Sequence, residues 1–281
     1  MCAYDTPPHV IEPQFPGAYE NLVSLCDCWD KDLLYDNRDE IIMLIETISK
    51  CHKGAVGYLY AAGSLLTELQ MTVSDAVDSQ KIIRFAKNMA QKEFSRRKDH
   101  RGQEKVRLLS AVTNKGPVLF NETVEALAPK LFVIDDNWGV ASHQLLSELR
   151  RLALESGWDI ISCCCPLFPF TKIDHLFIPE LGLGFVTRNK FHEITVPAYR
   201  TIHARRFTDM DKVTSRKHRI SFLQKAARNM IDEASSLIAE AKTLHDELEQ
   251  HYITAMDFPR VDAVCDKIVR EFENYIKDKN K

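Results

Sequence analysis

No stretch of the 281-residue chain approaches the roughly 18 consecutive apolar residues that a membrane-spanning helix needs. The first residues also lack the basic and then apolar order of a signal peptide. Nor is there an excess of positive charge, because 37 Lys and Arg residues stand against 40 Asp and Glu residues. These absences predict a globular cytoplasmic protein with no membrane contact, and they argue against a general nucleic-acid binder.

The eight cysteines lack the spacing of a zinc site. Cys26 and Cys28 form Cys-x-Cys, and no second pair follows at zinc-finger spacing. Cys163, Cys164 and Cys165 are consecutive at the end of an apolar run, and a strand would direct them to alternate faces. Buried reduced thiols behave as small apolar residues. We therefore expect structural cysteines and no metal site.

One short stretch, Lys130–Arg150, has the order of a phosphate-binding P-loop, with an apolar strand, a tight loop and an amphipathic helix. In a P-loop, backbone N–H groups and a helix N-terminus bind the phosphates of a nucleotide, and a lysine neutralises them. Aligned on the helix, this sequence keeps one glycine of three and lacks the lysine. It predicts the architecture of a P-loop with most of its chemistry removed. The aligned positions are Asp136, Gly139 and Ala141 for the glycines, Ser142 for the lysine and His143 for the Ser/Thr.

Each residue of this loop has a binding interpretation and a plainer structural one. Gly139 either binds phosphate or allows a tight turn, and Ser142 either contacts a phosphate or metal or caps the helix. His143 offers a proton donor but is mostly neutral at pH 7. Asp135 and Asp136 argue against phosphate, because a carboxylate about 5 Å away repels it by roughly 3 kcal/mol at an effective dielectric constant of about 20. They either hold Mg²⁺ or cap the loop.

Two further candidates lie in loops that should gather with the Asp135 loop at the carboxyl ends of parallel strands. Lys115, in the loop Asn114–Pro117, either supplies the charge of the lost lysine or is a solvated loop lysine. Glu180 follows an apolar run, where P-loop enzymes place the acid that handles Mg²⁺ and water. Pro179 makes an ordinary turn an equally good interpretation of Glu180.

The chain divides into helical and α/β parts. A proline-marked extended segment (1–36) and a helical hairpin (37–94, broken at 75–79) make a first domain, 1–103. Strands alternating with helices predict an α/β, P-loop-NTPase-like layer over 104–196, with a mostly parallel sheet and helices on both faces. A basic connector and a second hairpin, broken at 257–259, make the third part, 197–281. Within the layer we expect strands over 106–113, 131–134, 158–164, 175–178 and 182–187 and a helix over 121–127.

The two hairpins match one another when the first is shifted by 179 positions. Shared helical period does not explain an ungapped register that includes the turn between the helices. We therefore interpret the hairpins as an internal duplication. The matched pairs are Ile41 with Ile220, Leu44 with Leu223, Ala55 with Ala234, Ala62 with Ala241, Leu65 with Leu244, Glu68 with Glu247, Leu69 with Leu248, Ala76 with Ala255 and Asp78 with Asp257.

The duplication predicts that the first half is incomplete. A whole α/β layer, roughly 106–183, precedes the second hairpin, and none precedes the first. The apolar face of the first hairpin should then lack its cover, and an uncovered face of about several hundred Å² usually marks a partner site. We expect association as a homodimer or with a separate intact P-loop half-protein. The face in question includes Ile41, Leu44, Ile48, Leu65 and Leu69.

Three segments, Pro7–Ala18, Ser110–Pro117 and Ile178–Leu181, resemble a bacterial family of P-loop ATPase-like proteins built from two tandem halves. The family is common in spore-forming Gram-positive bacteria, and each half combines an α/β nucleotide-binding layer with a helical hairpin. The resemblance implies a loop of the form Gly-x-Pro-Gly-x-Gly-Lys-Ser/Thr in each half. This chain departs from that form at its loop and does not contain the layer that would hold the other.

Two function classes follow from the sequence. In the first, the protein derives from a P-loop NTPase, has lost ATPase activity on its own and retains at most weak binding of ATP or another nucleotide with Mg²⁺. In the second, it is an interaction or scaffold module, or the partner of an intact P-loop half. Thermal stabilisation by Mg-ATP discriminates between the two classes.

Overall fold

The computed structural model describes residues 23–94 and 100–279. These residues form two compact units. We name them the α/β unit, from residues 53–239, and the helical unit, from the described parts of 1–52 and 240–281. Helices α3 (Arg38–Ser74) and α8 (Lys217–Ala255) each contribute residues to both units. The units therefore divide the chain differently from the boundaries after residues 103 and 196 that the sequence suggested.

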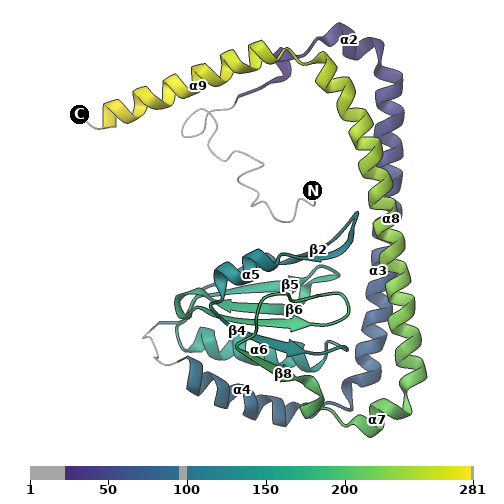
Figure 1. Cartoon of the computed structure of the whole chain (residues 1–281), viewed down its shortest axis with the longest axis vertical. Helices are drawn as coiled ribbons and strands as arrows, with labels where there is room; N and C mark the ends of the chain where they lie inside the picture. Colours follow the sequence, from purple (N-terminus) through teal and green to yellow (C-terminus); the bar gives the residue numbers. More distant parts are fainter. Residues whose placement is uncertain (1–22, 95–99, 280–281) are drawn as a thin grey trace. The chain divides into compact units, whose positions relative to one another are not determined.

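A six-stranded sheet forms the centre of the α/β unit (Figure 1). Five of its strands run parallel, while β6 runs antiparallel to both neighbours. The predicted mostly parallel sheet is thus confirmed, with one strand reversed. In spatial order the strands are β1 (Glu104–Leu108), β5 (Ile160–Cys165), β6 (Phe168–Ile178), β7 (Leu183–Arg188), β4 (Lys130–Asp135) and β8 (Arg200–His203).

The apolar run in β4 is buried on both sides because helices cover both faces of the sheet. Phe132 and Ile134 face α4 (Ser79–Glu93) and α6 (Ala141–Glu155), whose buried leucines and alanines complete the larger core. Leu131 and Val133 face α5 (Asn121–Leu127) and the hairpin of β2 (Ser110–Thr113) and β3 (Gly116–Leu119). Figure 1 shows these layers on opposite sides of the sheet.

Three local predictions need correction. The single strand expected over 106–113 is two strands, because the chain leaves the sheet after β1 and pairs β2 with β3. The basic connector contains β8, an outer strand that tolerates exposed charges because only one of its sides is paired, with β4. The segment before residue 37 contains η1 (Cys26–Cys28) and helix α2 (Lys31–Asp36), which Asp30 caps through its side chain. Residues 1–22 lie outside the described part.

Each predicted helical hairpin corresponds to a pair of successive helices, and the break between the two helices lies where the sequence placed it. The first consists of α3 and α4, and the second of α8 and α9 (Phe258–Lys279). Asp78 Oδ1 accepts a hydrogen bond from the backbone N–H of Lys81 at the start of α4. Asp257 Oδ1 accepts the corresponding bond from Arg260 at the start of α9. An aspartate at each break thus caps the start of the following helix.

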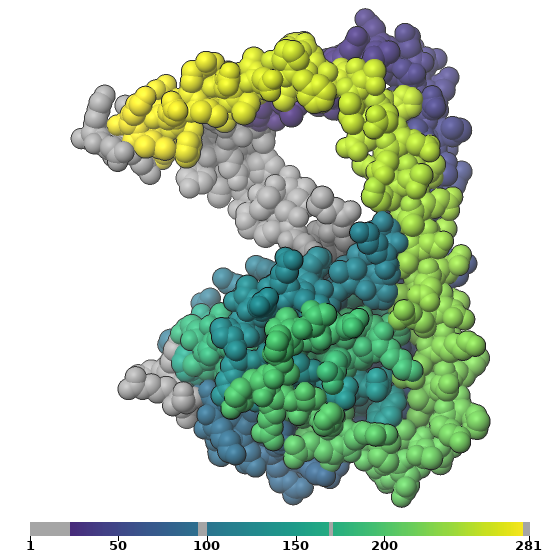
Figure 2. Space-filling view, viewed as in Figure 1, coloured from purple at the N-terminus to yellow at the C-terminus, as the bar shows by residue number. Residues whose placement is uncertain are grey.

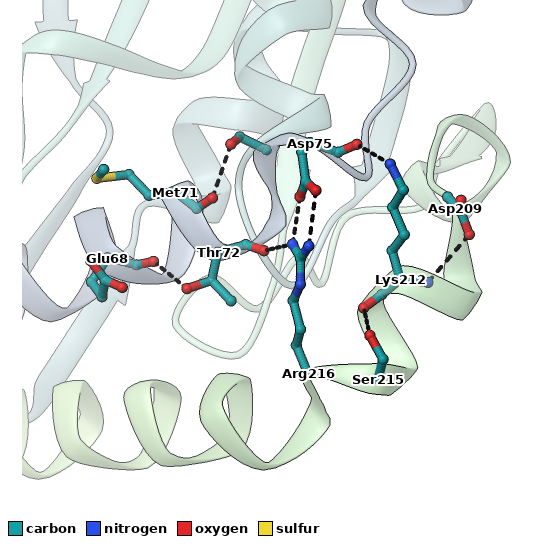
Figure 3. Close-up of polar contacts among 9 residues, drawn as sticks. Glu68, Met71, Thr72, Asp75, Asp209, Lys212, Ser215 and Arg216 are labelled. Atoms are coloured by element: carbon teal, nitrogen blue, oxygen red, sulfur yellow. Dashed lines mark hydrogen bonds and ion pairs between the residues drawn. The ribbon is translucent and has the colours of Figure 1, made fainter.

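In the α/β unit, the end of α3 is tied to α7 (Met210–Ser215) and the start of α8 (Figure 3). The Arg216 guanidinium bonds both oxygens of the Asp75 carboxylate and also the carbonyl oxygen of Thr72. Lys212 Nζ donates to the carbonyl oxygen of Asp75 at 3.0 Å. These bonds satisfy carbonyl groups that the end of a helix otherwise leaves unpaired.

Each unit also contains a pair of backbone hydrogen bonds that joins a hairpin turn to the segment preceding the other hairpin. Each residue in one pair of bonds lies 179 positions from the corresponding residue in the other pair, so that Asp30, for example, corresponds to Asp209. In the helical unit, Asp30 N donates to Ala255 O and Asp257 N donates to Cys28 O, both at 2.8 Å. In the α/β unit, Asp209 N donates to Ala76 O and Asp78 N donates to Phe207 O, both at 2.8 Å.

The apolar face of α3 is covered, contrary to the expectation from the sequence. Ile41 and Leu44 are buried in the helical unit, and Leu69 is buried in the α/β unit against Ile220 and Leu223 of α8. The reason is that the apolar faces of α3 and α8 pack against one another (Figure 1). Exposed apolar residues occur at other positions of α3, such as Ile42 and Met43, and on α9, where they include Ile268, Val269 and Phe272. Within the described ranges, none of the helices is both long and apolar enough to cross a membrane.

Candidate functional site

The loop between β4 and α6 is closed by its own aspartate. Asp136 is buried, and its carboxylate accepts hydrogen bonds from the backbone N–H of Trp138 at 3.0 Å and of Ser142 at 2.8 Å. Gly139 lies between them with φ +72, a backbone conformation that glycine adopts without strain. Both N–H groups are thus bonded to a carboxylate of the chain itself and are not free to bind another anion.

A lysine from another strand reaches the same loop. Lys172, in β6, lies so close that a Cβ atom on Gly139 would be 3.0 Å from its Nζ. The Lys172 Nζ is 2.8 Å from Asp174 Oδ1, and both side chains are buried, with exposed fractions of 12% and 1%. The second carboxylate oxygen of Asp174 has no hydrogen-bond partner among the described residues. The lysine therefore reaches the loop already paired with a carboxylate.

Mutual attraction keeps both members of this pair charged. Burial favours the neutral form of Lys172, but the attraction of Asp174 outweighs it and raises the lysine pKa, with a further contribution from Asp136. Burial likewise favours protonated Asp174, but Lys172 holds the pKa of this carboxyl well below its ordinary value. Together with Asp136, two carboxyl groups lie beside one lysine in this cluster. This composition disfavours an anion such as phosphate.

Two histidines lie beside the ion pair. The rings of His175 and His192 are 5.3 Å apart, and both side chains are buried. Burial, helped by His192, lowers the pKa of His175 to about 3, and burial also lowers the pKa of His192. The backbone N–H of Thr187 donates to His175 Nδ1 at 3.3 Å, so the neutral ring carries its proton on Nε2. Neither His175 Nε2 nor His192 Nδ1 has a hydrogen-bond partner in the described part of the chain.

The cavity at this place is small. Its volume is about 60 Å³, and its lining includes Trp138, Gly139, Cys165, Lys172 and Asp174. Pockets for small-molecule ligands typically have about 300–1,000 Å³. This cavity is therefore too small for a nucleotide, whereas a second pocket of about 420 Å³ shares the Lys172 side chain with it and is also lined by His143 and Arg150.

Of the residues proposed from the sequence, Asp136, Gly139 and Ser142 come together at this loop. Ser142 is buried and gives its backbone N–H to Asp136. His143 is the next residue of α6, half-buried, and burial lowers its pKa. Asp135 is not part of the cavity lining, because its carboxylate lies 3.1 Å from His203 Nδ1 and 3.7 Å from Arg188 Nε.

The other two candidates lie elsewhere. Lys115 is exposed at the tip of the β2–β3 hairpin, where its backbone N–H donates to Thr113 Oγ1 at 3.1 Å. Glu180 lies in η2 (Pro179–Leu181), beside Gly182, whose carbonyl accepts from the N–H of Lys130 at the start of β4. Because β6 is antiparallel, Glu180 lies at the end of the sheet opposite the Gly139 loop. The expected gathering of the three loops occurs only in part, because the Asn114–Pro117 loop contributes Pro117 to the cavity that Trp138 and Gly139 line, whereas Glu180 lies at the other end of the sheet.

Sequence reasoning missed the central residues of this cluster, Lys172 and Asp174. The available signal was their position directly before an apolar run, which makes them charged residues within a central strand. Buried charges of this kind are rare unless they are paired. The consecutive cysteines, in contrast, are structural in character, because burial raises the thiol pKa of Cys163 and of Cys165 to about 12.

Comparisons of this chain with protein-family models, curated proteins and solved structures find no significant match. The functional argument therefore depends on the geometry of the chain itself.

Proposed function

We propose that this protein is an interaction module built on an α/β layer related to P-loop NTPases, and that it does not hydrolyse ATP on its own. The observation that carries the proposal is the Asp136 carboxylate, which accepts hydrogen bonds from Trp138 N and Ser142 N at the start of α6. A nucleotide would have to displace this carboxylate and bring further negative charge into a small buried space. Both steps cost free energy.

Weak nucleotide binding is the alternative function, and one observation favours it. The Lys172 Nζ lies against Gly139, close to where the lysine of a P-loop would meet the phosphates. The Lys172 ammonium group is already paired with the Asp174 carboxylate at 2.8 Å. Phosphoryl transfer depends on a lysine that is free to bind the transferred group. We therefore place binding of ATP or another nucleotide with Mg²⁺ second to the interaction module.

We also propose that the two hairpins arose by internal duplication. Equal spacing along the chain supports this, since α2 and α7, α3 and α8, and α4 and α9 begin 179 positions apart in each case. The hydrogen bonds between turn and preceding segment keep the same spacing. The ion pair of Asp75 with Arg216 is not repeated, because the corresponding residues are Thr254 and Asn37.

Mg-ATP should leave the unfolding temperature of the protein unchanged, and phosphate release should not exceed background. A ligand that binds the folded state at 100 times its Kd would add about 2.7 kcal/mol of stability, which differential scanning fluorimetry detects easily. Stabilisation by Mg-ATP would instead support the alternative function. Phosphate release that the Gly139→Leu variant abolishes would show that the loop is a working catalytic site.

The Asp136→Ala variant tests why the loop is inactive. It frees two N–H groups and removes one negative charge, so sulfate should stabilise this variant more than it stabilises the unchanged protein at the same ionic strength. Asp159→Ala is the matched control, because Asp159 also accepts a backbone N–H, from Gln103, but away from the loop. An equal sulfate response in all three proteins would contradict the idea that Asp136 occupies an anion site.

A further inference from the structure

We propose that the exposed face of α9, together with Val23 and Leu25, is a docking site for an α/β domain of the same kind as residues 104–188. This inference rests on the interaction-module function and names the partner. The described residues supply such a domain for α4 and β8. They do not supply one for the corresponding elements of the helical unit.

The first step is that α9 stands in the same local relation to its neighbours as α4 does. In the α/β unit, Asp78 at the start of α4 donates its N–H to Phe207, the last residue of η3 (Ala204–Phe207). In the helical unit, Asp257 at the start of α9 donates its N–H to Cys28, the last residue of η1. Both bonds are 2.8 Å long. Each helix therefore starts from an equivalent anchor.

The second step compares the faces of these two helices. One stripe of α4 is buried against α6 and the sheet, and it includes Ile82, Ala86, Met89 and Ala90. The stripe of α9 at the same positions remains apolar but is largely uncovered. Val269, for example, is 50% exposed, whereas its counterpart Ala90 is 9% exposed. The counterparts on α9 are Val261, Cys265, Ile268 and Val269, and Phe272 and Ile276 continue the stripe.

Figure 2 shows one side of α9, in yellow, open along much of its length. Apolar residues at this helical spacing are typical of a face that packs against another element. An uncovered stripe of this kind on a protein surface usually marks an interaction site.

The third step concerns the segment before η1. In the α/β unit, the segment before η3 is β8, which pairs with β4. Its Ile202 is 1% exposed because it packs in the larger core with residues of α4 and α6. The counterpart of Ile202 is Val23, which is 50% exposed. Leu25 is also exposed, whereas its counterpart Ala204 is buried. An α/β domain docked on α9 would thus bury Val23 and Leu25.

These positions commit the site to an α/β domain with a free apolar face, and not to a second copy of this chain. The face that α4 occupies is formed by α6 and by residues such as Phe132 and Phe185. In a second copy this face is already covered by that copy's own α4. Two copies that met through their α9 faces would leave Val23 and Leu25 uncovered.

Cys265 is a built-in reporter for docking. It lies in the exposed stripe of α9, while its counterpart Ala86 is completely buried in the α/β unit. Alkylation of Cys265 by iodoacetamide can be followed by mass spectrometry of the peptide that contains it. In the unchanged protein this thiol should react at the rate of an exposed cysteine at every protein concentration.

The docking experiment uses a chimera in which residues 104–199 are repeated immediately before residue 21, in place of residues 1–20. This joins an added layer to the segment 21–25 as the existing layer is joined to β8. Alkylation of Cys265 should be about tenfold slower or more in the chimera, because the thiol reacts only when the docked domain opens. Val269→Glu in the chimera should restore fast alkylation, whereas Lys267→Gln, on the polar side of α9, should not.

Three results would overturn the proposal. Slow alkylation in the dilute unchanged protein would mean that the stripe is already covered within the chain. Alkylation that slows with concentration, together with dimers in light scattering, would assign the face to a second copy. Fast alkylation in a folded chimera would exclude docking. None of these readouts involves nucleotide, so they are independent of the test of Asp136.

Should the chimera fail to fold, the unchanged chain still provides a test. Val269→Asp should leave its unfolding temperature nearly unaltered, because this side chain is 50% exposed and is absent from the apolar cores of the described residues. Ala86→Asp, at a counterpart position of the same stripe on α4, should prevent folding of the α/β unit. A large loss of stability in Val269→Asp would show that the α9 face is already in use and would overturn the proposal.

Discussion

Replacing Lys172 with methionine should reduce the free energy of unfolding by about 3–5 kcal/mol, the range for breaking one side of a buried ion pair. The variant leaves Asp174, 1% exposed, without the ammonium group 2.8 Å away that keeps it ionised. It must then remain as a buried carboxylate or take up a proton, and both cost free energy. Urea unfolding with an unchanged m value is the measurement.

The double variant Lys172→Met/Asp174→Asn separates charge from packing. It removes both charges and keeps side chains of similar size, so most of the loss should be recovered. Arg219→Met is the matched control, because Arg219 forms an exposed ion pair with Glu68 in the same unit and should cost about 1 kcal/mol or less. If Lys172→Met reduced the free energy of unfolding no more than Arg219→Met does, the Lys172–Asp174 ion pair would not stabilise the fold. The lysine would then be available for another ligand.

The sheet and the helices of each predicted hairpin were predictable because their signals are local. The apolar run Leu131–Ile134 predicts a strand buried on both faces, and the structure gives it one. Aspartates at Asp78 and Asp257 predict helix starts, and both accept a hydrogen bond from the first turn of the following helix. In each case a few adjacent residues decide the backbone conformation, so an isolated sequence contains the information.

The direction of β6 and the composition of the site were not predictable in this way. An apolar run has the same pattern in a parallel and an antiparallel strand, and the reversed direction of β6 places Glu180 far from Gly139. Lys172 reaches that loop from β6, which follows α6 and β5 in the chain. Sequence spacing does not predict this contact, because it depends on how the strands pack in the sheet. The carboxylate of Asp136 was a candidate for repelling phosphate, but its two hydrogen bonds to the loop required coordinates.

The uncovered face was predicted on the wrong helix for a related reason. The sequence shows that α3 and α9 both carry apolar stripes, but it does not show which stripe has a partner. Ile41 and Leu44 of α3 are buried in the helical unit, while Val269 and Phe272 of α9 are exposed. Cover is a property of long-range packing, and the comparison of α9 with α4 became possible only once the contacts of both helices were known.

Lowering the pH from 7 to 5 should reduce the stability of the α/β unit by about 2 kcal/mol through His175 alone. Burial lowers the pKa of this histidine from 6.5 to about 3 in the folded protein. Below pH 6.5 the unfolded chain binds a proton that the folded chain does not, so unfolding becomes more favourable. The loss grows by about 1.4 kcal/mol per pH unit until the pH reaches the folded pKa. Above pH 6.5 this contribution is constant.

Between pH 5 and 6.5 the change of stability with pH arises from the buried histidines and not from the Lys172–Asp174 ion pair. Lys172 holds the pKa of Asp174 below its ordinary value, so stability from that carboxylate is lost only at more acidic pH. His192, with its pKa also lowered by burial, adds to the effect of His175 in the same direction.

His175→Asn keeps an acceptor for Thr187 N but removes the titrating ring, so stability should depend less on pH in this range. His245→Asn, at an exposed position, should not change the dependence. An unaltered pH dependence in His175→Asn would mean that water reaches this histidine in the folded protein, and the site would then be open where the structure shows it closed.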